Sequence, residues 1–336
     1  MKVAVVGGGI VGLTTAIELN KYLRNSDITV VAADYDDIVS YVAAGLFRVG
    51  HSYSGPTEEI TKKWISDSYS YYDNIRNNYK PIHSGITQSA IYMYSNSNAD
   101  VVKNPLMESV VPIYRNIKED EFNLVGGKWS YGSYYTTLII QSKYHLPWVK
   151  NQLKEKGTSF VTKKLESLKE LVDDYDLIFN CSGLGARKLC NDRKMIPIRG
   201  QVIRVQAPWI KAVYYGELDT YIIPGVDGTC TLGGTRNFES TRTAVCPYEA
   251  ESIRERCEEM LPSLTMAKTL DYAVGHRPHR EGGVRVEVEK ISNDRRKVNV
   301  VHNYGHGGYG VTTAPGTAKY AIELARDYHK ISGSKL

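Results

Sequence analysis

The first forty residues carry the clearest pattern of apolar and polar positions. Lys2 to Val6 is a short apolar run that fits a buried parallel strand, and a glycine-rich segment, GGGIVGL, follows from Gly7 to Leu13. Ile10 to Leu23 has the apolar spacing of a helix, and Ile28 to Ala33 is a second apolar run that ends at Asp34. The pattern predicts a strand, a glycine loop, a helix and a second strand, the order that opens a dinucleotide-binding domain.

Weaker patterns follow along the chain. Helices are predicted over Trp148–Lys156 and Thr312–Tyr328. Strands are predicted where β-branched and aromatic residues stand between prolines and glycines, at Ser159–Thr162, Tyr175–Asn180, Val202–Val205, Tyr221–Ile223, Thr229–Leu232 and Lys297–Val301. We therefore predict an α/β fold with a discontinuous Rossmann-type domain over 1–50, 136–190 and 285–330. A β-rich domain with a mixed or antiparallel sheet is predicted over 51–135 and 191–284, and an exposed tail over 331–336.

Composition narrows the class of protein. A length of 336 residues suggests roughly two domains, and 42% hydrophobic with 24% charged residues excludes general disorder. We find no run of about 18 apolar residues and expect no membrane span. The net charge of +5 is spread along the chain, so nucleic acid is not an expected partner. Five cysteines without a C-x-x-C pair argue against zinc and against a disulfide framework.

The glycine-rich segment fits G-x-G-x-x-G at Gly7, Gly9 and Gly12. The first glycine permits a tight turn, the second lets backbone approach a pyrophosphate, and the third allows close packing of helix against strand. The helix start, with Ile10 and Val11, offers unpaired N–H groups to phosphate. Asp34, 22 residues after Gly12, is placed to bond a ribose hydroxyl. The motif alone leaves NAD and FAD open.

Several longer strings resemble the D-amino acid oxidase family of FAD enzymes, which includes the D-aspartate oxidases. They recur in family order over nearly the whole chain: VAAGL (42–46), NCSG (180–183), RGQ (199–201), TYIIPG (220–225), TLGGTR (231–236), VGHRPHR (274–280) and VHNYGHGGYGVT (301–312). The resemblance implies non-covalently bound FAD and oxidative deamination of a D-amino acid. Hydride would pass from the substrate Cα to flavin N5, and oxygen would be reduced to hydrogen peroxide.

The resemblance also implies roles for particular residues. Arg277 and Tyr221 would bind the substrate α-carboxylate, the carbonyl of Gly308 would accept from the amino group, and no side chain would act as general base. Lys164 or Leu165 would lie near the adenine. The residues implied to line the flavin are Ala43, Ala44, Gly45, Leu46, Ser182, Gly183, Arg277, Gly307, Gly308, Tyr309, Gly310, Val311 and Thr312.

Arg236 would decide the substrate class. D-aspartate oxidases resemble this chain in carrying arginine after TLGGT, and a second guanidinium can pair with a side-chain carboxylate. Acidic D-amino acids are therefore the expected substrates: D-aspartate, with D-glutamate and N-methyl-D-aspartate as further candidates. Arg48 and His51 are weaker candidates for the same contact, and Glu217 would repel an acidic substrate if it faced inward.

Three alternatives stay open at this point: an oxidase of neutral D-amino acids, a flavin-binding protein without turnover, and an NAD-dependent dehydrogenase. The final residues, Ser334, Lys335 and Leu336, match a peroxisomal import signal. They predict an import receptor as partner and the peroxisomal matrix as location, a compartment suited to an enzyme that forms peroxide.

Overall fold

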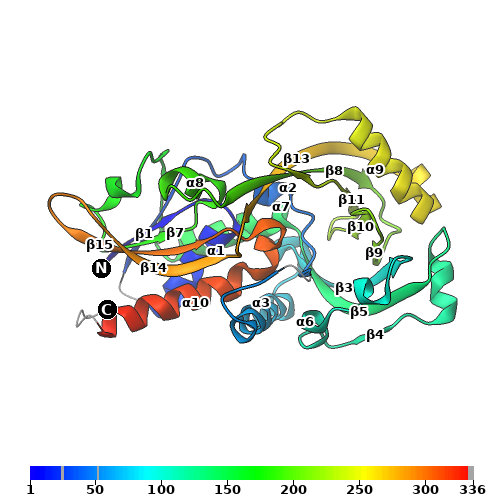
Figure 1. Ribbon diagram of the computed structural model, residues 1–336, viewed down its shortest axis with the longest axis horizontal. Coiled ribbons are helices and arrows are strands. Elements are labelled where there is room, and N and C mark those ends of the chain that lie inside the picture. Colours follow the sequence, from blue (N-terminus) through cyan, green and yellow to red (C-terminus); the bar gives the residue numbers. More distant parts are fainter. Residues whose placement is uncertain (24–25, 51–52, 332–336) are drawn as a thin grey trace.

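The protein is built on two β-sheets that lie side by side along its long axis, and its computed structural model describes residues 1–23, 26–50 and 53–331 (Figure 1). Within these residues the first sheet has six strands: β14 (Arg285–Ser292), β15 (Lys297–Tyr304), β7 (Leu177–Asn180), β1 (Lys2–Val6), β2 (Asp27–Ala32) and β6 (Ser159–Thr162), in that spatial order. All neighbours are parallel except the edge pair β14 and β15.

Helices and turns cover both faces of the first sheet, as a parallel sheet requires. Val3 and Val5 of β1 face a core shared with α1 (Ile10–Tyr22), α7 (Ser142–Glu155) and α10 (Gly310–Ile331). Ala4 and Val6 face the opposite layer, which includes the 3₁₀ turn η2 (Leu168–Leu171). Because successive side chains alternate, the single short run of β1 supplies both layers.

The second sheet is mostly antiparallel. Its described strands are β12 (Asn237–Phe238), β8 (Met195–Gln206), β11 (Thr229–Gly233), β10 (Tyr221–Pro224), β9 (Val213–Tyr215), β3 (Ile86–Ser95), β5 (Tyr131–Ile140) and β4 (Tyr114–Asn116), in spatial order, with β13 (Lys268–Arg280) paired to β8. Only β3 and β9 pair in parallel among them. Helix α9 (Pro247–Met260) packs on this sheet, while α3 (Glu58–Asn78) packs between it and α10.

Short elements complete the described chain: α2 (Val39–Val42), α4 (Pro81–Ser84), α5 (Ala99–Val102), α6 (Pro105–Glu108), α8 (Ala186–Leu189), and the 3₁₀ turns η1 (Glu119–Leu124), η3 (Gly183–Gly185), η4 (Pro262–Met266) and η5 (Gly307–Tyr309). No helix among the described residues is long and apolar enough to cross a bilayer.

Two long strands of the second sheet connect it with the first sheet. The long pair β8 and β13 runs from the second sheet to the turns η3 and η5, which follow strands of the first (Figure 1). A single β-bridge joins His279 of β13 to His306, and another joins Leu46 to Ile139 of β5. Residues near the end of β13 are therefore carried to the loops at the carboxyl edge of the first sheet.

The predicted α/β class with a parallel and a mostly antiparallel sheet is confirmed. Several predicted elements differ in extent. Strand β8 begins at Met195 rather than Val202, and α7 begins at Ser142 rather than Trp148 despite Pro147 inside it. The predicted boundary at 135/136 cuts β5, which continues unbroken to Ile140 in the second sheet because all ten residues pair with β3.

Candidate functional site

A cavity of about 1300 Å³ lies at the carboxyl ends of β1, β2 and β7, where an open α/β sheet binds its ligands. Its far wall is formed by β8, β10 and β13 of the second sheet. The volume exceeds the roughly 300–1000 Å³ of an ordinary small-ligand pocket. The space therefore suits an extended ligand together with a second, smaller one.

The predicted glycines have three different environments. A Cβ at Gly7, whose φ is +123°, would lie 2.4 Å from the carbonyl oxygen of Cys181, and one at Gly12 would lie 2.0 Å from that of Gly7. These two positions keep the loop, α1 and β7 close together. A Cβ at Gly9 would meet only Ser40 Oγ, at 3.2 Å, so Gly9 mainly leaves space in the cavity that it lines.

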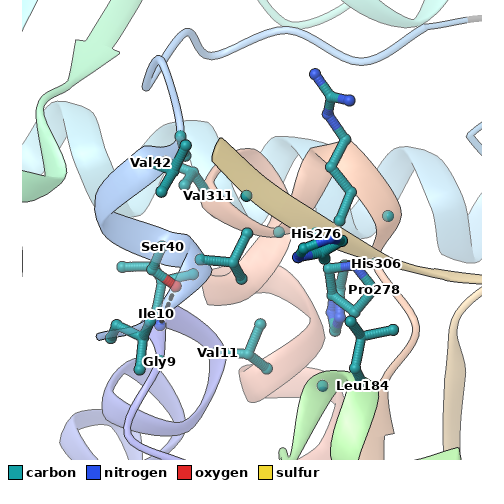
Figure 2. Close-up of a pocket in the computed structure, with 18 of the residues that line it drawn as sticks. Gly9, Ile10, Val11, Ser40, Val42, Leu184, His276, Pro278, His306 and Val311 are labelled. Atoms are coloured by element: carbon teal, nitrogen blue, oxygen red, sulfur yellow. Dashed lines mark hydrogen bonds between the residues drawn. The ribbon is translucent and has the colours of Figure 1, made fainter. Parts of the chain in front are cut away.

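The start of α1 faces this cavity. Gly9 is its N-cap and offers no side chain, while the Ile10 N–H donates to Ser40 Oγ at 3.1 Å. Figure 2 shows Gly9, Ile10 and Val42 on one side of the pocket, with His276 and Pro278 on the other. A flat ligand can enter between these two walls, with its anionic part at the helix N-terminus.

The other end of the cavity contains Asp34, Lys164 and Leu165. Asp34 is exposed, and its Oδ1 accepts the N–H groups of Asp36 (2.7 Å) and Asp37 (3.0 Å), which lowers the pKa of the carboxyl. The group is therefore an anion that can accept from ribose hydroxyls.

All predicted cofactor residues line the cavity except Gly12, which packs behind Gly7. Their individual roles toward the cofactor stay predictions. Gly45 takes a φ of +77°, and a Cβ there would meet the Ile140 carbonyl oxygen at 2.1 Å, so this glycine lets the loop after α2 lie close to the end of β5. The string 307–312 forms η5 and the first turn of α10.

Unpaired polar atoms support an extended polar ligand. Within the described residues, four that line the cavity have a buried side-chain polar atom without a hydrogen-bond partner: Arg48 Nε, Ser182 Oγ, His276 Nε2 and Asn303 Oδ1. Buried polar groups in folded proteins are normally paired. A cofactor with donors and acceptors along its length fits these residues and the glycine cradle.

The position of Arg277 depends on contacts with Gly200, from the RGQ string, and with Thr235, from the TLGGTR string. A Cβ at Gly200 would lie 2.5 Å from Arg277 Nη1, so glycine is needed where the guanidinium crosses β8. The same Nη1 donates to the Thr235 carbonyl at 3.0 Å. Arg277 Cδ also lies beside Gly308, 3.3 Å from where its Cβ would be. The structure thus brings two predicted substrate-binding residues into contact.

Tyr221 lies in a slot made by two glycines. Cβ atoms at Gly233 and Gly234 would be 2.0 and 2.7 Å from its ring and hydroxyl, and the ring stacks on Tyr215 with centroids 5.9 Å apart. Burial raises the pKa of Tyr221 to about 12, although the charge of Arg277 opposes the shift. The hydroxyl therefore stays protonated at neutral pH and can donate to a carboxylate.

Arg236 lines the cavity, but its Nη2 pairs with Asp219 Oδ1 at 2.9 Å and 47% of its side chain is exposed. Glu217 does not line the cavity. Its Oε1 accepts from Ser95, Asn96 and Ser97, and these bonds lower its pKa to about 2. The carboxylate that lines the cavity beside Arg236 is thus Asp219, which the sequence did not single out.

Arg48 also lines the cavity, with its guanidinium 4.5 Å from the centre of the Tyr215 ring. His51 and the predicted import signal, Ser334–Leu336, lie outside the described residues, and both stay predictions. Sequence reasoning missed Ser40, Tyr215, Asp219 and His276 as lining residues. Ser40, Tyr215 and Asp219 are placed by partners elsewhere in the chain, which no local motif marks. His276 stands in the string VGHRPHR, but the string assigned no role to it.

A glycine cradle on a parallel sheet, open to a cationic pocket on an antiparallel one, defines a dinucleotide-dependent oxidoreductase. The chain belongs to the FAD dependent oxidoreductase family, whose model matches residues 2–324, and FAD is accordingly its cofactor.

Named relatives agree with this family. The chain is 33% identical over 329 residues to D-aspartate oxidase of Homo sapiens, covering 97% of this chain and 95% of that one. It is 32% identical over 333 residues to D-amino acid oxidase of Dugesia ryukyuensis, covering 97% and 98%. Glycine oxidase of Bacillus cereus has a similar fold, with a TM-score of 0.79 over 97% of both chains at 17% identity.

Proposed function

We propose that the protein oxidatively deaminates acidic D-amino acids, D-aspartate above all, to the 2-oxo acid, ammonia and hydrogen peroxide. FAD supplies the two-electron acceptor, and the protein supplies position and electrostatics. Support for the reaction comes from the family, and support for the D-configuration comes from the named relatives.

The net charge of the residues around the substrate pocket supports an acidic substrate. Arg48, Arg236 and Arg277 line the cavity around the stacked pair Tyr215 and Tyr221, and Asp219 is the carboxylate among them. Three cations and one anion leave two positive charges. A dicarboxylic amino acid brings two carboxylates, whereas a neutral amino acid brings one and leaves a guanidinium without a counter-ion.

The remaining residues orient this substrate. Arg277 and the protonated hydroxyl of Tyr221 would hold the α-carboxylate, and the Gly308 carbonyl would accept from the amino group. Fixing one carboxylate at Arg277 and the other at a second guanidinium leaves little rotational freedom. Such positioning can supply up to about 7–11 kcal/mol of a reaction barrier.

A second candidate is an oxidase of neutral D-amino acids. Two observations favour it: the relative from Dugesia ryukyuensis is named D-amino acid oxidase, and Asp219 already compensates the charge of Arg236. In that case the pocket would accept side chains without charge, and D-alanine would be oxidised as efficiently as D-aspartate.

A peroxide-coupled screen of the purified holoenzyme against D- and L-amino acids separates these functions. We expect D-aspartate to give the highest kcat/KM, with its L-enantiomer inactive. Preference for D-alanine would establish the second candidate. If no amino acid bleaches the bound flavin under anaerobic mixing, the chain is a flavin-binding protein without turnover.

A further inference from the structure

We propose that Arg48, rather than Arg236, binds the side-chain carboxylate of the acidic substrate. The inference rests on the proposed function and names the residue that selects the substrate within that site. It assigns the selection to the loop after Leu46 instead of to the TLGGTR string.

Among the described residues Arg48 forms no ion pair, and its buried Nε has no hydrogen-bond partner. Burial disfavours its charge, and the pKa of Arg48 is nevertheless raised by neighbouring groups that include Asp219, which is itself paired with Arg236. The guanidinium instead lies over the ring of Tyr215, 4.5 Å from its centre. Such a contact offsets the loss of hydration only in part. An arginine in this state is suited to receive an anion from the cavity.

Arg236 is in the opposite situation. Its guanidinium already donates to Asp219 at 2.9 Å, and nearly half of its side chain is exposed. Solvent screens an exposed pair, so the contact adds little selectivity. To bind the substrate, Arg236 would first have to give up Asp219, which remains beside it as a competing anion.

The backbone around Arg48 is fixed from two sides. Thr312 Oγ1 accepts the Arg48 N–H at 3.3 Å and lies 3.1 Å from the carbonyl oxygens of Leu46 and Arg48. Asn104 Nδ2 donates to the Val49 carbonyl at 2.8 Å. The fixed backbone and the contact with the Tyr215 ring both limit the positions of the guanidinium before a ligand binds, which favours discrimination between similar ligands.

A series of contacts along the cavity connects Arg48 with Arg277. Arg48 lies on Tyr215, and Tyr215 stacks on Tyr221. The slot of Tyr221 ends at Gly234, and the next carbonyl, that of Thr235, accepts from Arg277. Arg48 and Arg277 therefore line the same cavity at the two ends of one series of contacts, and the proposal assigns one carboxylate of the substrate to each.

The test compares D-aspartate with D-asparagine, its uncharged isostere, in the holoenzyme and its variants. Arg48→Met removes the charge and keeps most of the stem, and Arg236→Met is the matched control. We expect Arg48→Met to lower the kcat/KM ratio of D-aspartate to D-asparagine by about 100-fold, comparable to truncating one partner of a buried charge pair. Arg236→Met should lower the ratio by less than about tenfold, as for an exposed pair.

The possible outcomes distinguish a failure of the Arg48 proposal from a failure of the proposed function. If Arg48→Met keeps the wild-type ratio while Arg236→Met abolishes it, Arg236 is the selecting residue and the proposed function stands. If the wild-type enzyme does not prefer D-aspartate over D-asparagine, the proposed function fails and the inference with it. Should Arg48→Met fail to retain FAD, Arg48→Gln replaces it. If that variant also fails, a retained ratio in Arg236→Met supports the proposal and a lost ratio overturns it.

Discussion

Gly9 is the residue whose replacement separates cofactor binding from folding. An alanine there would meet only Ser40 Oγ, at 3.2 Å, but its methyl group would enter the cradle at the start of α1. We expect Gly9→Ala to keep the thermal stability of the apoprotein and to weaken FAD binding at least about tenfold, because backbone approach to the pyrophosphate is lost. Titration of apoprotein with FAD measures this.

Gly12→Ala provides the contrast. Its Cβ would lie 2.0 Å from the Gly7 carbonyl oxygen, so the loop and α1 must move apart. Lower stability of the apoprotein is expected in this variant. An equal loss of apoprotein stability in Gly9→Ala would contradict the different roles given to the two glycines.

Tyr221 tests how the α-carboxylate is held. Removing its hydroxyl in Tyr221→Phe keeps the ring in its glycine slot and its stacking on Tyr215. Loss of a hydrogen bond to a charged group costs about 1.5–3 kcal/mol, so the Kd for D-aspartate should rise at least about tenfold. Rapid-mixing kinetics measure this Kd. Tyr214→Phe, in a residue of β9 that does not line the cavity, should leave it unchanged.

At the scale of single residues, sequence motifs predicted the site residues that have a local signature. They missed the residues whose importance comes from a contact with a distant part of the chain. Gly7, Gly9 and Arg277 could be named because spacing or string marked them. Asp219 could not, because its importance comes from Arg236, 17 positions later. The need for glycine at position 200 could not be predicted either. The guanidinium of Arg277 lies against Gly200 only because β8 and β13 pair in the folded chain.

At the scale of elements, the turn between β9 and β10 supplies Asp219, the carboxylate that pairs with Arg236. Asp219 has a φ of +57°, a conformation that asparagine tolerates, so Asp219→Asn should keep the turn while removing its charge. Because one anion leaves the pocket, we expect malonate to bind several-fold more tightly, measured by perturbation of the flavin spectrum. Glu217→Gln, in the same turn but bonded to Ser95 and Ser97, is the control without effect. Weaker malonate binding by Asp219→Asn would oppose this arrangement.

Helix α7 should make stability depend on pH. His145 is fully buried, its Nδ1 lies 3.0 Å from the Ser84 carbonyl oxygen, and burial lowers its pKa from 6.5 to about 4. Between these values the unfolded chain binds a proton that the folded chain excludes, so the free energy of unfolding falls as pH drops. From pH 7.5 to 5 this histidine alone should cost about 2 kcal/mol. Denaturant unfolding of His145→Asn should show a correspondingly smaller loss, and an equal loss would reject the assignment.

Element prediction succeeded where side chains were uniformly apolar. The run of β1 has the predicted bounds, since it is buried on both faces. Helix α3 was not predicted, because its buried positions include Trp64, Ser68 and Tyr72, which give a weak apolar signal in a chain rich in polar residues and tyrosine. Strand β5 was not predicted either.

For the whole molecule, the order of the motifs predicted a discontinuous nucleotide domain, and the first sheet does draw its strands from the two ends and the middle of the chain. The register of β8 with β13, which brings Arg277 to η5, could not be predicted, since it depends on long-range pairing. That pairing joins the cofactor cradle to the cationic pocket, and the function depends on both.

The most direct test of the central claim is anaerobic stopped-flow reduction of the bound flavin by D-aspartate and by D-asparagine. These substrates have nearly the same size and shape, and the side-chain charge that the pocket is proposed to recognise is present only in D-aspartate. We predict a second-order rate constant at least about 100-fold higher for D-aspartate, as expected when a buried cation loses its partner. Equal rate constants, or faster reduction by D-asparagine, would contradict the account.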